Sequence, residues 1–198
     1  MSPLNKDEQR CLLELAREAI AAALALRPLE LEAAAARLPT DRLRQPGGAF
    51  VSLHRAGRLR GCVGYPTPRK PLYQTVAEAA LAAAFHDPRF EPLSAEGLPA
   101  VEIEISLLSP LFPIQPEQVQ PGTHGLLVTQ GLQRGLLLPQ VAQEHGWGRE
   151  EFLEETCAKA GLEREAWKKG AVKLEAFTAF VFSDASRFVE TLSAKPSK

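Results

Sequence analysis

The chain has 198 residues, 45% of them hydrophobic and 24% charged, which is typical of a globular protein with one core or two small lobes. A net charge of −1, with no basic run longer than two residues, argues against charge-driven binding to nucleic acid or to an anionic membrane. Because no apolar stretch is of membrane-spanning length and the N-terminus is unlike a signal peptide, we expect a cytoplasmic location.

Two helices are predicted before the first strand. Residues 6–26 combine strong helix formers with apolar residues at helical spacing, so one stripe of this helix should face a core. Arg27-Pro28 ends it, residues 29–38 form a second, shorter helix, and "RQPGG" at 44–48 is a loop. The stripe comprises Leu12, Leu15, Ala16, Ala19 and Leu24.

The middle of the chain mixes strands and helix. Residues 49–65 predict a β-hairpin, which the proline-rich loop 66–71 follows. Residues 71–85 are alanine-rich and predict a helix that stops before "HDPRFEPL", since residues before proline avoid helical geometry. The alternating pattern of 99–111 predicts a strand.

The last third repeats this mixture. Residues 124–139 predict a second hairpin, 139–147 and 148–162 predict two helices, and 171–183 predicts a strand. Gly161 should end the second of these helices. We therefore expect an α+β fold with a mainly antiparallel sheet and flanking helices.

The first hairpin allows two registers. A two-residue turn at Ala56-Gly57 would put Ala56 at positive φ, whereas a three-residue turn that begins at Arg55 and forms a bulge avoids this. The second register also gives one uniformly apolar face, so we favour it. It pairs His54 with Arg58, Ser52 with Arg60 and Phe50 with Cys62.

Cys62 is the most reactive side chain in this hairpin. In the favoured register it lies beside Arg60, away from the core, and a nearby guanidinium favours a thiolate. Gly61 and Gly64 would let a ligand or another backbone approach closely. The alternative is that Cys62 is a small buried hydrophobe. Cys11 and Cys157 lie on apolar helix faces and are expected to fill the core.

A thiolate nucleophile needs a base within hydrogen-bond reach. His54 would lie about 13 Å from Cys62 along the paired strands, at ~3.3 Å per residue, which excludes it. Of the other histidines we favour His124, which a glycine follows at the start of a strand, although it also fits a purely structural turn residue. The expected pair is therefore Cys62, as nucleophile or redox thiol, and His124 as proton carrier.

Further polar residues are candidates for ligand binding. Glu102, Glu104 and Ser106 share one face of a strand, where two carboxylates suit acid–base chemistry, a metal or simply solvent. Asp87 and Arg89 flank a proline and could bind a ligand or pair with each other. The three cysteines and four histidines lack zinc-ligand spacing, and no phosphate-binding glycine loop precedes a helix, so we expect no metal.

With these motifs in view, the chain resembles the AMMECR domain family, whose bacterial and archaeal members are called AmmeMemoRadiSam system protein A. The resemblance runs from Gly48 to Phe182, and residues 1–47 match only as a helical lead-in to a single domain spanning 1–198. The ordered motifs are "LRGCVGY" at 59–65, "AAFHDPRFEPL" at 83–93, "ISLLSP" at 105–110, "THGLLV" at 123–128, "LLLPQVAQEHGW" at 137–147 and "KAGL" at 159–162.

The resemblance implies two unequal lobes around an antiparallel sheet and no cofactor of the chain's own. It also implies association with a Memo-like protein and a radical S-adenosylmethionine enzyme, without supplying a reaction. The motif positions that it marks include Arg60, Gly61, Cys62, Gly64, Asp87, Arg89, Ser106 and His124, and Glu104 fits the prokaryotic members.

Three alternative hypotheses for the function follow from these residues and from the resemblance. The chain is a cysteine-dependent enzyme that uses Cys62 and His124, or a module that binds a small anionic or modified substrate at Arg60 and Arg89, or a scaffold for the partner enzymes. We expect one of the first two, within a multi-protein modification pathway.

Overall fold

The computed structural model describes residues 4–170 and 172–185. These residues fall into two compact units of unequal size. The first comprises the described residues up to Leu108 together with those from Phe180 onward, and the second comprises Ser109–Ala179. The expected α+β class with two lobes is confirmed, although the predicted single sheet is two separate four-stranded sheets.

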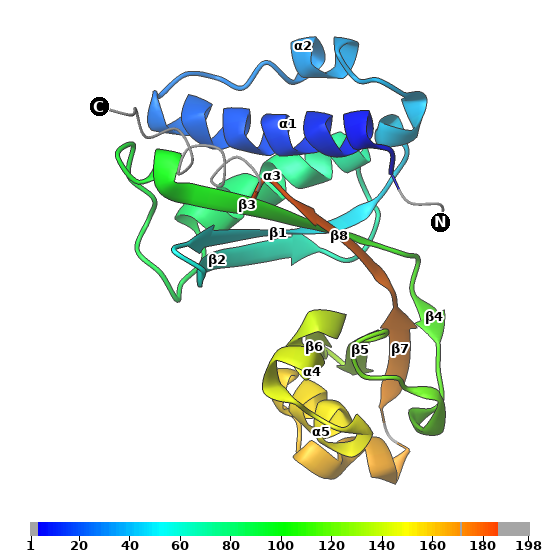
Figure 1. Ribbon diagram of the computed structural model, residues 1–198. Coiled ribbons are helices and arrows are strands. Elements are labelled where there is room, and N and C mark those ends of the chain that lie inside the picture. The colour runs from blue at the N-terminus through cyan, green and yellow to red at the C-terminus, as the bar shows by residue number, and fades with distance from the viewer. Residues whose placement is uncertain (1–3, 171, 186–198) are drawn as a thin grey trace, which may run out of the picture. The chain divides into compact units, whose positions relative to one another are not determined.

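The first unit packs helices on one face of a sheet with strand order β2-β1-β3-β8. Strands β1 and β2, and likewise β1 and β3, are antiparallel. Helices α1 and α3 lie on the same side of this sheet, while α2 lies on the far side of α1 (Figure 1). The strands are β1 (Gly48–Arg55), β2 (Arg58–Tyr65), β3 (Val101–Leu108) and β8 (Ala179–Ser183), and the helices are α1 (Lys6–Leu24), α2 (Leu31–Ala36) and α3 (Leu72–Phe85).

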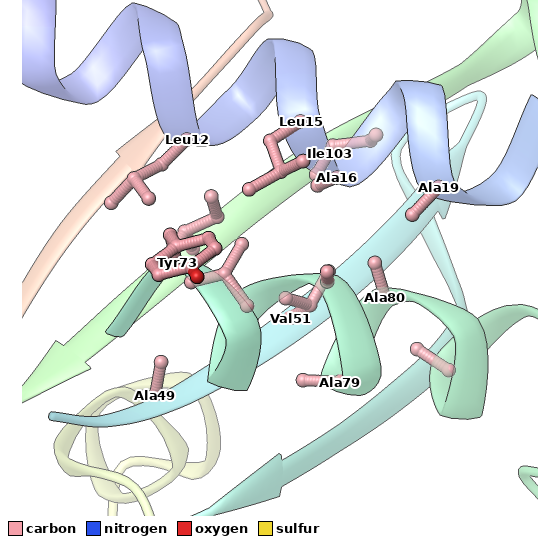
Figure 2. Packing of buried hydrophobic residues seen from close by; sticks show 14 of the residues in the cluster. Leu12, Leu15, Ala16, Ala19, Ala49, Val51, Tyr73, Ala79, Ala80 and Ile103 are labelled. Atoms are coloured by element: carbon pink, nitrogen blue, oxygen red, sulfur yellow. The ribbon is translucent and has the colours of Figure 1, made fainter. Parts of the chain in front are cut away.

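The core of the first unit lies between the two helices and the sheet. Leu12, Leu15, Ala16 and Ala19 are buried as the helical spacing predicts, and Leu24 is partly buried. Figure 2 shows Leu12, Leu15, Ala16 and Ala19 on the side of α1 that faces α3 and the sheet, with Ala80 of α3 and Ile103 of β3 among the neighbouring side chains. The sheet supplies alternate residues to this core face, namely Ala49, Val51, Leu53, Val101, Ile103, Ile105 and Leu107.

The register predicted for the first hairpin is wrong. Arg55 pairs with Arg58 across a two-residue turn in which Ala56 has φ +50° and Gly57 has φ +74°. The pairing then shifts between Leu53 and His54, so that Arg60 is an extra, bulged residue of β2. This bulge restores the apolar face, because Leu53 meets Gly61. The twist of a type I′ turn suits a hairpin and outweighs the positive φ of Ala56.

The second unit has its own sheet, of order β4-β7-β5-β6, in which each neighbouring pair is antiparallel. Its core residues include Leu126, Phe152, Leu153, Ala176 and Phe177. Gly161, at φ +74°, directly follows the last turn of α5, as predicted. The elements are β4 (Phe112–Pro113), β5 (Gly125–Gln130), β6 (Gln133–Leu137), β7 (Lys173–Phe177), α4 (Pro139–His145) and α5 (Arg149–Lys159).

The strand predicted at 171–183 is two strands. Residue 171 lies outside the described residues, β7 belongs to the second unit's sheet, and β8 pairs into the first unit's sheet. The split falls at Thr178, whose backbone N–H donates to Ser109 Oγ at 3.0 Å. The partial alternation of apolar and polar residues in 171–183 does not reveal that the two halves of this segment pair with strands of different sheets.

Short 3₁₀ turns complete the chain at Asp41–Arg44, Leu98–Ala100, Pro116–Gln118 and Arg164–Lys169. Among the described residues, no helix combines the length and apolar character needed to cross a membrane.

Candidate functional site

Three strands place a thiol, a hydroxyl and a carboxylate in one row. Ser52 of β1 pairs with Cys62 of β2 on one side and with Glu104 of β3 on the other. Side chains of directly paired residues share a face, and this face is opposite the one that carries Val51 and Leu53 to the core. Cys62 and Glu104 are partly buried and Ser52 is buried, so the row is only partly open to solvent.

The Cys62 thiol is hydrogen-bonded and partly shielded from water. Ser52 Oγ donates to Cys62 Sγ at 3.3 Å. Burial raises the pKa of the thiol above its ordinary value, against the lowering effects of the Ser52 hydrogen bond and the Arg89 charge. Asp87 and Glu104 raise the pKa further through their negative charge. In the resting protein the group is therefore a protonated thiol at neutral pH, whereas the sequence favoured a thiolate.

Asp87 and Arg89 hold the backbone of Cys62. Asp87 Oδ2 accepts the Cys62 N–H at 2.9 Å, and Arg89 Nη2 donates to the Cys62 carbonyl at 3.2 Å. The two side chains also pair with each other, through Nε to Oδ1 at 2.9 Å and Nη2 to Oδ2 at 2.7 Å. These bonds hold the pKa of the buried Asp87 carboxyl well below its usual range. Of the two roles considered for this pair, the structure shows the internal ion pair.

Arg60 does not flank the thiol in the way that the sequence predicted. Its Nη1 donates to the Ala84 carbonyl at 3.4 Å and its Nη2 to the Glu91 carbonyl at 2.7 Å. Because Arg60 is the bulged residue of β2, its side chain bonds the end of α3 and the segment that follows. The guanidinium whose charge acts on Cys62 is that of Arg89.

The two glycines beside Cys62 serve packing within the first unit. A Cβ at Gly61 would lie 2.1 Å from the Ala83 carbonyl oxygen, so β2 and α3 touch backbone to backbone there. A Cβ at Gly64 would lie 2.3 Å from the Phe50 ring and 2.4 Å from the Ala49 carbonyl oxygen. The sequence left open whether a ligand or another backbone takes this space, and protein atoms fill it at both positions.

Ser106 stands in the neighbouring row of the same face. It pairs with Phe50, which in turn pairs with Gly64, and it is almost completely buried. Within residues 4–170 and 172–185, no group of three or more His, Cys, Asp or Glu side chains is arranged to hold a metal ion. The two carboxylates of β3, Glu102 and Glu104, lie on the same face of the sheet as Ser52 and Ser106.

His124 belongs to the second unit, whereas Cys62 belongs to the first. The Nδ1 atom of the His124 ring accepts the backbone N–H of Gln120 at 3.2 Å, and the backbone N–H of His124 donates to the Gln120 carbonyl at 2.9 Å. The ring also packs edge-on against Phe112, with centroids 5.9 Å apart. Because Nδ1 is an acceptor, the neutral ring carries its proton on Nε2 and presents a donor.

Sequence reasoning missed Ser52 as part of this site. In the incorrect register Ser52 paired with Arg60, so nothing placed its hydroxyl on the thiol. A two-residue turn at Ala56-Gly57, combined with a bulge at Arg60, keeps the alternation of apolar residues and places Ser52 opposite Cys62. The sequence pattern was therefore compatible with the observed pairing.

Comparisons with known proteins agree with this architecture. The AMMECR1 family model matches residues 13–182. The chain belongs to the AMMECR1 family. The match begins inside α1, so the family resemblance extends into the lead-in of residues 1–47.

Relatives and a solved structure in this family cover nearly the whole chain. A protein of Methanothermobacter thermautotrophicus is 42% identical over 193 residues, which is 92% of this chain and 97% of that protein. A protein of Thermofilum pendens is 38% identical over an alignment of 206 residues, which covers 94% of this chain and 94% of that protein. The crystal structure of the uncharacterized protein PH0010 from Pyrococcus horikoshii has a TM-score of 0.86 at 36% identity and covers 93% of this chain and 95% of that one. The AMMECR1 fold is thus shared along the chain.

Proposed function

We propose that this AMMECR1-family chain acts on or binds a small substrate at Cys62, as one component of a modification pathway. The observation that carries the proposal is the partly buried Cys62 thiol, bonded by Ser52 and held at its backbone by Asp87 and Arg89. Fixing the backbone of a nucleophile from two sides positions it for reaction.

In the enzymatic form of the proposal, Cys62 attacks an electrophilic atom of the substrate after losing its proton. The role of proton carrier stays with His124 only as a prediction from the sequence, because His124 belongs to the other unit. Glu104 lies on the face that the substrate contacts, the almost completely buried Ser106 belongs to the same face of the sheet, and Arg60 and Arg89 border it at the edge of β2. The family resemblance adds a Memo-like protein and a radical S-adenosylmethionine enzyme as partners, in the cytoplasm.

Alkylation with neutral iodoacetamide tests the thiol. Peptide mass spectrometry on the folded protein should show Cys62 reacting faster than Cys157, with a rate that rises steeply above neutral pH because the thiol pKa is raised. Cys157 is fully buried and serves as the internal control. If Cys62 reacts no faster than Cys157 at any pH below denaturation, thiol chemistry at this site is excluded.

The alternative is a scaffold without a reaction, and a binding assay separates the two. In a pull-down with the Memo-like protein or the radical enzyme, a scaffold that docks through this face loses binding when Arg60, Cys62 or Glu104 is changed. The enzymatic proposal expects Cys62→Ser to leave partner binding intact, because serine keeps the size of the side chain and removes only the thiol.

A further inference from the structure

Three arginines gather at the turn of the first hairpin. Arg55 and Arg58 are exposed and pair directly with each other across the Ala56-Gly57 turn. Side chains of directly paired residues share a face, with Cβ atoms about 5 Å apart. Arg60 follows two residues later on β2. Burial lowers its pKa, Asp87 opposes this effect, and the positive charge of Arg55 adds to it. We call Arg55, Arg58 and Arg60 the hairpin arginines.

No acidic side chain of the first unit balances this charge. In the part of the chain that the structure describes, none of the hairpin arginines forms an ion pair with a carboxylate. On β3, Arg55 pairs with Val101, which is buried and apolar. Asp87 acts on Arg60 electrostatically, but its carboxylate is already paired with Arg89 at 2.7 Å. The positive charge of the cluster therefore faces solvent.

The arrangement of Arg55 and Arg58 is unfavourable for the folded hairpin. Like charges directly opposite each other on paired strands lower stability. Ala56, between them, has φ +50°, which is strained for alanine. Both arginines are exposed, so neither side chain is needed to fill the core. Unfavourable local features that the packing does not require indicate a role outside the folding of the hairpin.

Exposed arginines favour a partner that presents several carboxylates together. One ion pair in water contributes little, so a small anion would gain little from the hairpin arginines. A protein segment with several acidic residues gains from each contact and also covers apolar surface. Leu59, between Arg58 and Arg60 in the sequence, is 40% exposed and supplies such a surface. A nucleic acid or an anionic membrane would find only this small cluster on a chain of net charge −1.

We propose that the hairpin arginines form a docking surface for an acidic segment of a partner protein, with an apolar side chain of that segment on Leu59. The inference goes beyond the proposed function, because it concerns the recognition of a partner and does not depend on the reactivity of Cys62. It also gives that partner a position. Arg60 is two residues from Cys62, about 7 Å along the strand, so a partner docked here lies beside the thiol.

Fluorescence anisotropy with a synthetic acidic peptide tests the docking surface. The probe is an octapeptide in which Glu alternates with Ala and Leu, labelled with a neutral dye, and its control has Gln in place of Glu. Wild type should bind the Glu peptide at about 50 mM salt, more weakly at about 300 mM salt, and should bind the Gln peptide about tenfold more weakly or not at all.

Two double variants with the same change of net charge locate the binding. Arg55→Gln/Arg58→Gln should weaken binding of the Glu peptide by about tenfold, because two exposed charge contacts are lost. Arg27→Gln/Arg69→Gln is the matched control, since both arginines are exposed residues of the first unit, and it should change binding by less than about twofold. Urea unfolding should show Arg55→Gln/Arg58→Gln to be at least as stable as wild type, because the repulsion across the turn is gone.

Several results would overturn the inference. They are no binding of the Glu peptide up to about 1 mM, equal losses of affinity in the two double variants, or a loss of stability in Arg55→Gln/Arg58→Gln. Tighter binding of labelled oligothymidylate, or of vesicles that contain phosphatidylserine, would identify a nucleic acid or a membrane as the partner instead. Cys62→Ser should bind the peptide as wild type does. Failure of thiol alkylation would therefore remove the proposed function and leave this docking surface, and loss of peptide binding would do the reverse.

Discussion

The Asp87 carboxylate accepts the backbone N–H of Cys62 at 2.9 Å, so a side chain occupies the hydrogen-bonding edge of β2 where another strand could pair. Arg89 completes the arrangement by donating to the carbonyl of the same residue at 3.2 Å. An edge strand with unpaired backbone groups invites association, and this pair blocks it at the position of the thiol. Protection of the edge and positioning of Cys62 thus come from the same two side chains.

Asp87→Asn should destabilise the protein by about 2 kcal/mol at pH 7. The amide keeps an acceptor for Cys62, but its NH₂ group faces the Arg89 guanidinium and loses the charge-assisted pair. The contribution of the wild-type Asp87 carboxylate to the free energy of unfolding depends on pH. Because the folded pKa of Asp87 lies far below the unfolded value, this stabilisation is complete above about pH 5 and declines as the pH falls below about 4. Urea unfolding at pH 7 and pH 3 measures the loss of stability in Asp87→Asn and its dependence on pH.

The gap in unfolding free energy between wild type and Asp87→Asn should therefore be smaller at pH 3 than at pH 7. Glu91→Gln is the matched control, since Glu91 is an exposed carboxylate in the same connecting segment and contacts Arg60 only through its backbone carbonyl. A gap that stays constant between the two pH values would contradict the ionic origin of the effect.

Gly61→Ala should destabilise the protein by about 3 kcal/mol or more. The new methyl group would meet the Ala83 carbonyl oxygen at 2.1 Å, and two backbones cannot separate as easily as a side chain can move. Gly148→Ala is the control, because its Cβ would have nothing within 4 Å. Thermal or denaturant unfolding compares the two, and similar losses in both variants would show that close packing is not the reason for Gly61.

Ala56→Asn should stabilise the first hairpin by about 0.5–1 kcal/mol. Ala56 has φ +50° in an exposed two-residue turn, where asparagine is tolerated far better than alanine, and Asn-Gly is the preferred pair for this turn. Urea unfolding gives the change in free energy. Ala158→Asn, inside α5, should lower stability instead, which separates turn geometry from a general effect of asparagine.

The same hairpin shows what the sequence could and could not predict. Helical spacing in 6–26 and strand alternation in 99–111 were sufficient for α1 and β3, because local periodicity reflects burial on one face. The register of β1 and β2 depended on weighing a positive φ at Ala56 against a bulge at Arg60. Local rules did not reveal the bulge at Arg60, which keeps Leu53 opposite Gly61 after a two-residue turn.

Similar reasons explain the outcome at the site. The family motifs pointed to Cys62, Asp87 and Arg89, and the structure brings these three together. Their roles needed coordinates, because Asp87 and Arg89 act on the backbone of Cys62 and a motif does not distinguish backbone from ligand contacts. His124 shares the motif pattern but belongs to the other unit, which spacing along the chain does not reveal.

The neutral His124 ring should carry its proton on Nε2. The Gln120 N–H points at Nδ1 and the Phe112 ring fixes the plane of the imidazole, so the opposite tautomer would set two N–H groups against each other. Long-range ¹H–¹⁵N NMR at pH 8 distinguishes the two tautomers by their nitrogen shifts. A protonated Nδ1 would contradict this geometry and favour His124 as the base that accepts a proton at Nε2.

Ser52→Ala should raise the pKa of Cys62 further. The Ser52 hydroxyl donates to the sulfur at 3.3 Å, and a donor favours the charged form of the group that it bonds. Losing it should move the midpoint of the iodoacetamide pH–rate profile to higher pH and slow the alkylation of Cys62 below that midpoint. Ser52→Thr keeps the hydroxyl and should retain the wild-type midpoint. If alanine and threonine give the same profile, Ser52 only fills space, and the thiol is governed by burial and by the charges of Arg89, Asp87 and Glu104 alone.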